Sequence, residues 1–308
     1  MSSNNPSVLY IVGPTATGKT QLAISLAHQL GGEIVNADSR QVYKYMDIGT
    51  AKPTREERAQ VPHHLFDLIT PAENFSLGRF LTLATAAVHD ISRRKSLPIV
   101  VGGTGQYVWA LRDGWEVPAV PPDNEYRTEL ERVAAAQGAQ ALYHRLQSID
   151  PKRAAELDPR NARRVIRALE INHVTGKRPS ELPAVSGQGL EGLVIGLTMG
   201  RSLLYERIDR RVDQMMENGF LEEAKNLAAM GYTLGEGCLA CPGYKELGQY
   251  LGGEMSLADA IQRTKFQTHR LVRRQYTWFK PSDSRISWLD GLESELSSIA
   301  LNLAAQIT

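Results

Sequence analysis

The chain has few of the residues that would mark a secreted or membrane-spanning protein. Only two of its 308 residues are cysteines, which excludes a framework of disulfide bonds. No apolar run approaches the ~18 residues of a membrane-spanning helix, so we expect no contact with a membrane. The first residues, Met1–Pro6, lack the basic and apolar regions of a signal peptide. These absences predict a cytoplasmic protein.

The chain also lacks an overall charge of one sign. Its 35 lysines and arginines balance 34 acidic residues, and the net charge of +1 does not by itself indicate a nucleic-acid partner. The hydrophobic fraction of 42% and the charged fraction of 22% are those of an ordinary globular protein. A chain of this length can form one large domain with an insertion, or two domains.

The positive charge is nevertheless unevenly distributed. Residues 260–280 contain no acidic residue but include a C-terminal basic cluster of Arg263, Lys265, Arg270, Arg273, Arg274 and Lys280. A central basic cluster, only partly offset by Glu156, Asp158 and Glu170, consists of Lys152, Arg153, Arg160, Arg163, Arg164, Arg167, Lys177 and Arg178. Each cluster is either a solvated helix face or a surface that binds a polyanion. The charges alone leave both interpretations open.

A glycine-rich loop lies near the N-terminus, between an apolar run at residues 8–12 and an amphipathic stretch at residues 22–30. It has the G-x-x-x-x-G-K-[ST] spacing of a phosphate-binding loop and consists of Gly13, Pro14, Thr15, Ala16, Thr17, Gly18, Lys19 and Thr20. Its glycines let backbone N–H groups turn inward, and the following helix adds the positive end of its dipole. Lys19 supplies a cation and Thr20 a hydroxyl suited to Mg²⁺. We therefore expect a ligand that carries a di- or triphosphate.

The first third of the chain alternates between strand and helix patterns. Apolar runs predict strands over residues 7–12, 33–37 and 98–101, and helical spacing predicts helices over 18–30 and 76–95. Residues 124–175 are helical, 193–197 are typical of another buried strand, and further helices are expected over 203–217, 221–230 and 258–280. The predicted fold is α/β, a P-loop NTPase-like doubly wound parallel sheet with a helical insertion domain and a helical C-terminal region. We expect residues 1–114 and 191–308 to form the core and residues 115–190 to form the insertion.

Asp38 follows the second predicted strand, where a doubly wound sheet places it beside the phosphate loop. There its carboxylate could hold Mg²⁺ through water or accept a proton from a substrate; the alternative is an ordinary turn aspartate. The strand ending at Val101 is followed by Gly102, Gly103 and Thr104 without an acid, which disfavours simple ATP hydrolysis. The two glycines indicate either backbone that approaches a ligand, with Thr104 able to hydrogen-bond it, or a tight turn.

Cys238 and Cys241 have C-x-x-C spacing in a glycine-rich stretch. A zinc site would need a second cysteine pair or histidines at finger spacing, and a redox site would need a helix start after a strand. The sequence offers neither, so residues 242–246 are better interpreted as a loop that touches a ligand.

The end of the C-terminal basic cluster interleaves basic and aromatic residues over 273–280. Arg263, Arg270 and Arg274 share one face of the predicted helix. Basic groups contact phosphates and aromatic rings stack on bases, which favours an RNA partner. The alternative places Trp278 and Phe279 in the core.

Nine segments in register across nearly the whole chain resemble one family. They are GPTATGKT, ADSRQVYKYMDIGTAKPT, VPHHLFDL, PIVVGGTGQYVWAL, NARRVIRALE, TGKRPS, RIDRRVDQM, GYKEL and RRQYTWF. By these segments the chain resembles the tRNA dimethylallyltransferases, also called tRNA isopentenyltransferases. The likeness is to the bacterial form, because the chain ends at Thr308 without the zinc finger that eukaryotic members often carry. Pro242 stands where many relatives have a small or aliphatic residue.

The resemblance implies transfer of a dimethylallyl group from dimethylallyl diphosphate to the exocyclic amine of the adenosine 3′ of the anticodon in tRNA. The phosphate loop would cradle the diphosphate, and Thr17, Lys19, Thr20 and Arg211 would bind it, with Mg²⁺ held at Thr20. Asp38 would be the general base that takes a proton from the amine. The target base would have to be flipped out of the anticodon loop.

The resemblance also implies contacts with the tRNA anticodon stem-loop, made by a protein that we expect to be a monomer. The implied contact residues are Asp38, Ser39, Arg40, Gln41, Thr104, Arg127, Arg163, Arg164, Val165, Ile166, Arg167, Ala240, Cys241, Pro242, Gly243, Tyr244, Lys245, Arg273, Arg274, Gln275, Tyr276, Thr277, Trp278, Phe279 and Lys280. Both basic clusters reach into these regions.

Two other functions stay open on the residues alone. A P-loop kinase that uses ATP on a small metabolite explains the phosphate loop but leaves the C-terminal basic cluster without a role. A non-catalytic RNA-binding protein explains the basic clusters but leaves the phosphate loop and Asp38 without one.

Overall fold

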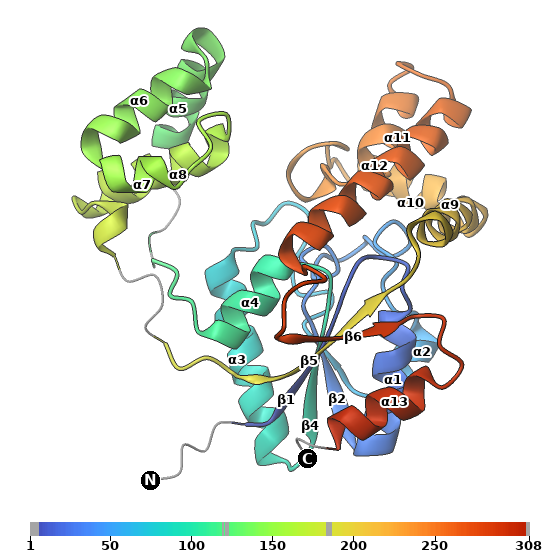
Figure 1. Ribbon diagram of the computed structural model, residues 1–308. Helices are drawn as coiled ribbons and strands as arrows, with labels where there is room; N and C mark the ends of the chain where they lie inside the picture. Colours follow the sequence, from blue (N-terminus) through green and yellow to red (C-terminus); the bar gives the residue numbers. More distant parts are fainter. Residues whose placement is uncertain (1–5, 119, 121–122, 183–186, 306–308) are drawn as a thin grey trace. The chain divides into compact units, whose positions relative to one another are not determined.

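The computed structural model describes residues 6–118, 120, 123–182 and 187–305 (Figure 1). Contacts within the chain divide it into two compact units. The core unit comprises residues 1–114 and 188–308, and the helical unit comprises residues 115–187. The phosphate loop and the C-terminal basic cluster belong to the core unit, and the central basic cluster belongs to the helical unit.

Six parallel strands form the sheet of the core unit, in the order β3-β2-β4-β1-β5-β6. They are β1 (Val8–Val12), β2 (Gly32–Asn36), β3 (His63–His64), β4 (Leu97–Val101), β5 (Gly192–Thr198) and β6 (Ile286–Asp290). In the middle of the sheet, Tyr10 pairs with Val100 of β4 and with Val194 of β5. The predicted parallel α/β fold is confirmed. The two edge strands were not predicted, because β3 has two residues and β6 mixes apolar with polar side chains.

The helices of the core unit are α1 (Lys19–Leu30), α2 (Arg55–Gln60), α3 (Leu77–Arg93), α4 (Gly105–Asp113), α9 (Arg201–Glu217), α10 (Phe220–Ala229), α11 (Tyr244–Leu251), α12 (Leu257–Trp278) and α13 (Leu296–Ala304), with a 3-10 turn at Gly237–Leu239. Figure 1 shows α1 and α13 on one face of the sheet and α3 and α4 on the other. Because successive residues of a strand point to opposite faces and both faces are covered, β1 is wholly apolar and completely buried. In the described part of the chain, no helix has the length and apolar character needed to cross a membrane.

Two helices of the C-terminal region, α11 and α13, were not predicted. Tyr244, expected in a loop, begins α11 and is completely buried. The helix starts here because the side chain of Glu246 accepts a hydrogen bond from the N–H of Gly243 at 2.8 Å. Further along, α9 and α12 pack together through Leu204, Ile208 and Val272.

The helical unit contains α5 (Asn124–Gln137), α6 (Ala139–Ile149), α7 (Pro151–Ala155) and α8 (Ala162–Thr175), followed by a 3-10 turn at Pro179–Glu181. Three of these helices begin at capping side chains, since Asp123, Asp150 and Asn161 accept first-turn N–H groups. Leucines such as Leu130 and Leu146 form a core of its own for this unit.

Candidate active site

The phosphate loop leaves β1 and enters α1 with a backbone shaped for an anion. Gly13 has φ 129°, and a Cβ there would lie 2.3 Å from the carbonyl oxygen of Leu197, so only glycine fits. Gly18, the N-cap of α1, has no side chain to satisfy the first-turn N–H groups. These groups and the helix dipole are therefore directed at an external anion.

Two side chains of the loop converge on one of its own carbonyl groups. The hydroxyl of Thr17, which is completely buried, donates to the carbonyl oxygen of Pro14 at 2.9 Å, and Nζ of Lys19 donates to the same oxygen at 2.6 Å. Thr17, which was expected to bind the diphosphate, stabilises the conformation of the loop through this bond.

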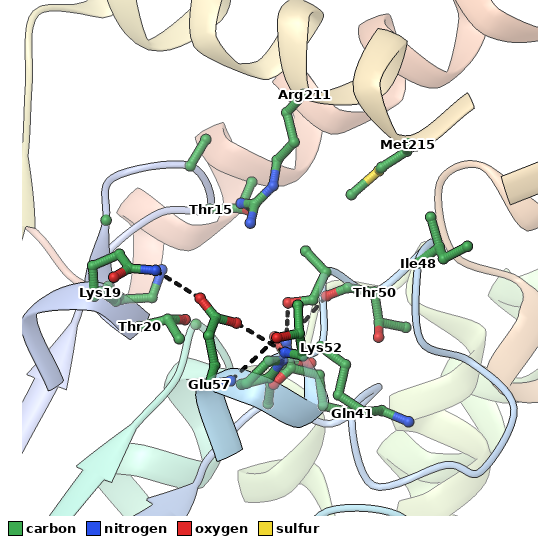
Figure 2. Close-up of a pocket in the computed structure, with 18 of the residues that line it drawn as sticks. Thr15, Lys19, Thr20, Gln41, Ile48, Thr50, Lys52, Glu57, Arg211 and Met215 are labelled. Carbon is green, nitrogen blue, oxygen red and sulfur yellow. Dashed lines mark hydrogen bonds between the residues drawn. The ribbon is translucent and has the colours of Figure 1, made fainter. Parts of the chain in front are cut away.

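A cavity of about 900 Å³ opens over the phosphate loop (Figure 2). Its walls come from the phosphate loop, the ends of β2 and β4, the segment 47–58 and helix α9. In Figure 2, Arg211 and Met215 reach into the cavity from α9, and Thr50 and Lys52 lie on the opposite side. The loop and Arg211, which are far apart in the sequence, therefore share one cavity.

The end of the cavity at the phosphate loop is strongly cationic. Burial lowers the pKa of Lys19 to about 8; the carboxylate of Asp38 opposes this shift and the guanidinium of Arg211 adds to it. Burial also lowers the pKa of Arg211, with a further contribution from Arg207. Nη1 of Arg211 lies 3.5 Å from the hydroxyl of Thr15. An anion bound between these cations would relieve both their repulsion and their loss of hydration.

Asp38 is held in a fixed position at the end of β2. Its Oδ1 accepts the backbone N–H of Arg40 at 2.8 Å, and its own N–H donates to Oδ1 of Asn36 at 2.8 Å. The amide of Asn36 is anchored in turn on the carbonyl oxygen of Leu65 at 3.0 Å. The side chain of Asp38 is half-buried and lines the large cavity.

A second, smaller cavity of about 100 Å³ meets the first at Asp38. Much of its lining is apolar, with Ile208, Val212, Phe220 and Leu271 among the contributors. Seven residues line both cavities: Thr15, Asp38, Thr50, Ala51, Arg211, Met215 and Gln275. Five expected RNA contacts line the smaller one: Arg40, Cys241 and Pro242 line it alone, and Asp38 and Gln275 line both. Asp38 thus stands where a cationic cavity and an apolar cavity join.

Gln275 and Thr104, which were expected to contact RNA, form hydrogen bonds that connect segments of the site. Gln275 accepts the N–H of Thr15 at 2.9 Å and donates to the carbonyl oxygen of Gly103 at 3.2 Å. The hydroxyl of Thr104 accepts the N–H of Ser39 at 3.0 Å. A Cβ on Gly103 would lie 2.3 Å from Nε2 of Gln275. The close approach indicated by this glycine is therefore made by a protein side chain.

The other expected RNA contacts of the core unit divide by exposure. Arg273, Arg274, Thr277, Lys280, Ala240 and Lys245 are exposed, while Ser39, Arg40, Gln41, Cys241, Pro242, Tyr276 and Trp278 are half-buried. Tyr244 and Phe279 have no exposed surface, so their side chains belong to the interior of the core unit. The hydroxyl of Tyr276 pairs with that of Thr198 at 2.8 Å.

In the helical unit, the expected RNA contacts also separate into two groups. Arg163 and Arg164 are exposed on α8. Val165 and Ile166 belong to the unit's core. Arg127 and Arg167 each lie 2.6 Å from a different carboxylate oxygen of the completely buried Glu170.

Sequence reasoning did not single out Thr50, Ala51 and Met215, which line both cavities. Met215 lies four positions after Arg211, and helical spacing could have placed it on the same face of α9. Thr50 and Ala51 lie in a turn-rich stretch whose position depends on contacts with distant helices, for which the sequence carries no local signal.

Among the described residues, no group of three or more His, Cys, Asp or Glu side chains is arranged to hold a metal ion. The large cavity is nevertheless lined by Thr20, Asp38, Asp47 and Glu57. This donor set fits Mg²⁺ in its usual mode, with few protein ligands and the remaining positions taken by phosphate oxygens and water.

These features define the class: the protein is an α/β enzyme in which a phosphate loop and the carboxylate of Asp38 line one cavity. Comparison with known proteins narrows this class. The model of the IPP transferase family matches residues 41–282, and a model described as isopentenyl transferase matches residues 6–64. The chain belongs to the IPP transferase family.

Individual relatives agree with this assignment. The tRNA dimethylallyltransferase of Roseiflexus sp. (strain RS-1) is 50% identical over 89% of this chain and 90% of the relative, and that of Thermomicrobium roseum is 46% identical over 94% and 88%. The solved tRNA isopentenylpyrophosphate transferase of Bacillus halodurans superposes with a TM-score of 0.72 at 43% identity, over 97% of this chain and 96% of that one. A eukaryotic dimethylallyltransferase acting on tRNA gives a TM-score of 0.82 at 32% identity, over 97% and 79%.

Proposed function

We propose that the protein transfers a dimethylallyl group from dimethylallyl diphosphate to the exocyclic amine of the adenosine immediately 3′ of the anticodon in tRNA, releasing diphosphate. The observation that carries this proposal is the position of Asp38, where the cationic cavity over the phosphate loop meets the smaller apolar cavity. Support also comes from the relatives named tRNA dimethylallyltransferases and from the solved neighbour described as acting on tRNA.

In this proposal the phosphate loop holds the diphosphate of the isoprenoid donor rather than ATP. Lys19 and Arg211, together with the first-turn N–H groups of α1, stabilise the negative charge that develops as the carbon–oxygen bond breaks. Thr17 keeps the loop in shape through Pro14. Thr20 would hold Mg²⁺ together with diphosphate oxygens, and the metal would supply further neutralisation of the leaving group.

The acceptor base enters from the side of the smaller cavity, past Arg40, Cys241 and Pro242. It must first leave its stack, at a cost of a few kcal/mol, which contacts with exposed basic residues such as Arg274 would offset. The amine nitrogen forms a bond to the allylic carbon while the carbon–oxygen bond breaks and its electron pair leaves with the diphosphate. Asp38 accepts the proton that the amine loses, a contribution of about 10²- to 10⁴-fold.

The two alternative functions explain less of the molecule. Membership of the IPP transferase family does not favour a P-loop kinase. A non-catalytic RNA-binding protein would leave the two joined cavities and Asp38 without a role.

One assay separates the three functions. The protein is incubated with unmodified tRNA, radiolabelled dimethylallyl diphosphate, ATP and Mg²⁺, and label in the RNA is counted alongside consumption of ATP. We expect label to pass from dimethylallyl diphosphate to the tRNA. ATP consumption without labelled RNA would overturn the proposal in favour of a kinase, and RNA binding with neither reaction would favour a binding protein.

The role of Asp38 is tested by Asp38→Asn, which keeps the shape of the side chain but removes the base. We expect kcat to fall by about 10²-fold or more, while the affinity for tRNA stays close to that of the unaltered protein. Asp90→Asn, at an exposed position on α3, is the matched control. Weakened tRNA binding with near-normal kcat would contradict the role as base.

A further inference from the structure

We propose that Glu223, on α10, is a positioning residue for dimethylallyl diphosphate and acts through the backbone of segment 47–51. The inference rests on the proposed function. Oε2 of Glu223 accepts the N–H groups of Asp47 and Ile48 at 2.9 and 2.7 Å, and Oε1 accepts that of Gly49 at 3.0 Å. Three consecutive backbone donors, more than 170 residues distant in the sequence, thus converge on one carboxylate.

A fourth donor completes this arrangement. The hydroxyl of Tyr244 donates to Oε1 of Glu223 at 2.6 Å, so each carboxylate oxygen accepts two hydrogen bonds. Burial and the neighbouring carboxylate raise the pKa of Tyr244, which keeps its hydroxyl protonated and able to donate. The ring packs edge-on against Phe220 with centroids 5.0 Å apart. Glu223 therefore joins α10, α11 and segment 47–51 at a single point.

The segment that Glu223 holds forms a wall of both cavities. Asp47 and Ile48 line the large cavity, Gly49 lines the small one, and Thr50 and Ala51 line both. Glu223 is not one of the lining residues of either cavity. Its effect on bound substrate is therefore exerted through the backbone that it holds.

The segment fits closely against its support. A Cβ on Gly49 would lie 2.2 Å from Cε2 of Phe220 and 2.6 Å from Cζ of Tyr244, so the backbone lies directly on these rings. Other bonds of the segment run from Nε2 of Gln41 to the carbonyl oxygens of Thr50 and Ala51 at 3.1 Å, and from the N–H of Ala51 to the carbonyl oxygen of Ile48 at 3.0 Å. Glu223 accepts the three N–H groups of residues 47–49. Without it these groups would lose their acceptor, and the wall would move away from α10.

Asp38 is held independently of this wall, by Asn36 and by the N–H of Arg40. Displacing the wall should therefore weaken binding of the donor while leaving the group that takes the proton in place. The expected signature is a higher KM for dimethylallyl diphosphate with little change in kcat.

The test compares Glu223→Gln with the matched control Glu222→Gln. The first variant keeps the shape of the side chain but loses the charge and one acceptor; the second removes an exposed carboxylate that pairs with Lys225 at 2.7 Å. For Glu223→Gln we expect KM for the donor to rise about tenfold, the loss of one hydrogen bond to a charged group, with kcat within about twofold. The control should match the unaltered enzyme in both constants.

Each other outcome counts against a different statement. If the unaltered enzyme transfers no label to tRNA, the proposed function fails. If the unaltered enzyme does transfer label, two results for Glu223→Gln would show that the positioning role is wrong. One is a lower kcat alone, which a reduced fraction of folded enzyme would also produce; the other is no change in either constant. Should Glu223→Gln fail to fold, Tyr244→Phe removes one of the four bonds and keeps the buried ring. We expect that variant to raise KM for the donor about threefold, and an unchanged KM there would equally overturn the inference.

Discussion

The two basic clusters look alike in the sequence but meet different partners in the structure. In the helical unit, Arg153 pairs with Glu156, Arg160 with Asp158, and Arg167 with the buried Glu170. On α12, by contrast, Arg263, Arg270 and Arg274 are exposed and form no ion pair with any described residue. Part of the central cluster is thus neutralised by acids of its own unit, whereas Arg163 and Arg164, like the three arginines of α12, stay available to a polyanion.

The difference comes from where the acidic residues lie. The central cluster carries acids within three positions of these arginines, so its ion pairs are local. The acid-free stretch of α12 instead finds partners on α9, where Asp213 pairs with Lys265 at 2.7 Å and Asp209 with His269 at 2.8 Å. Those pairs use the face of α12 that packs on α9. The positive charges of the outer face, on Arg263, Arg270 and Arg274, have no acidic partner among the described residues. A run of charge therefore indicates a binding surface only where both local and cross-helix acids are missing.

The largest expected effect concerns the buried member of the central cluster's ion pairs. Glu170→Ala leaves Arg127, Arg167 and the N–H of Asp123 without their acceptor. We expect the free energy of unfolding of the helical unit to fall by about 2 kcal/mol. This is less than the 3–5 kcal/mol typical of breaking a fully buried ion pair, because each guanidinium is about one third exposed. Hydrogen exchange of α5 and α8 measures this locally, and Glu156→Gln, at an exposed pair, is the control. If Glu170→Ala has no more effect than the control, the internal role of this cluster is wrong.

The contribution of Glu170 should depend on pH. Burial alone would raise its pKa, but hydrogen bonds from Arg127, Arg167 and the N–H of Asp123 outweigh burial and hold the pKa below its ordinary value. A carboxyl group of this kind stabilises the fold above its unfolded pKa of about 4.3 and loses that effect as the pH falls through the folded value. The extra stability of the unaltered protein over Glu170→Gln should be complete near neutral pH and shrink below about pH 4. Hydrogen exchange, corrected for the intrinsic exchange rates at each pH, measures this stability difference. A difference that grows in acid would contradict the lowered pKa of Glu170.

Much of the fold follows from local patterns. The strands β1, β2, β4 and β5 were predicted because buried parallel strands are continuous apolar runs. The edge strands escaped because β3 has only two residues and β6 has a mixed pattern. The start of α11 at Tyr244 escaped because its N-cap is Gly243, which has no capping side chain to mark the position, although Glu246 accepts its N–H.

The candidate site was predictable where one motif or one edge of the sheet defines it. Asp38 and the phosphate loop follow strands whose carboxyl ends meet at one edge, and they line the same cavity. The wall formed by Thr50 and Ala51 was not predictable, because its position depends on bonds such as that from Gly49 to the distant Glu223. The sequence also did not reveal which arginines are exposed. Arg164 and Arg167 lie on the same helix, yet Arg164 is exposed and Arg167 is bound to Glu170.

The next effect tests whether the outer face of α12 contacts the RNA backbone. The double variant Arg270→Gln with Arg274→Gln should weaken tRNA binding roughly tenfold, about 0.7 kcal/mol for each exposed contact. The slope of log affinity against log salt should fall by about two, one for each lost phosphate contact. Arg160→Gln, which removes a charge already paired with Asp158, should change neither quantity. A salt slope unchanged in the double variant, or lowered as much in the control, would remove the distinction between the clusters.

The smallest expected effect uses an exposed apolar side chain in each region. Phe266, between Arg263 and Arg270 on α12, is 55% exposed, and Val174 on α8 is 44% exposed. Neither contributes much to a core, so Phe266→Ala and Val174→Ala should leave Tm nearly unchanged. If the outer face of α12 contacts RNA, the ring of Phe266 adds stacking or ribose contact, and its removal should weaken tRNA binding about fivefold, near 1 kcal/mol at the lower end of base–aromatic stacking. Val174→Ala should leave the affinity for tRNA as it was. Equal affinities for the two variants would restrict the RNA contact of α12 to its arginines, and a drop in Tm for Phe266→Ala alone would show that this ring serves packing instead.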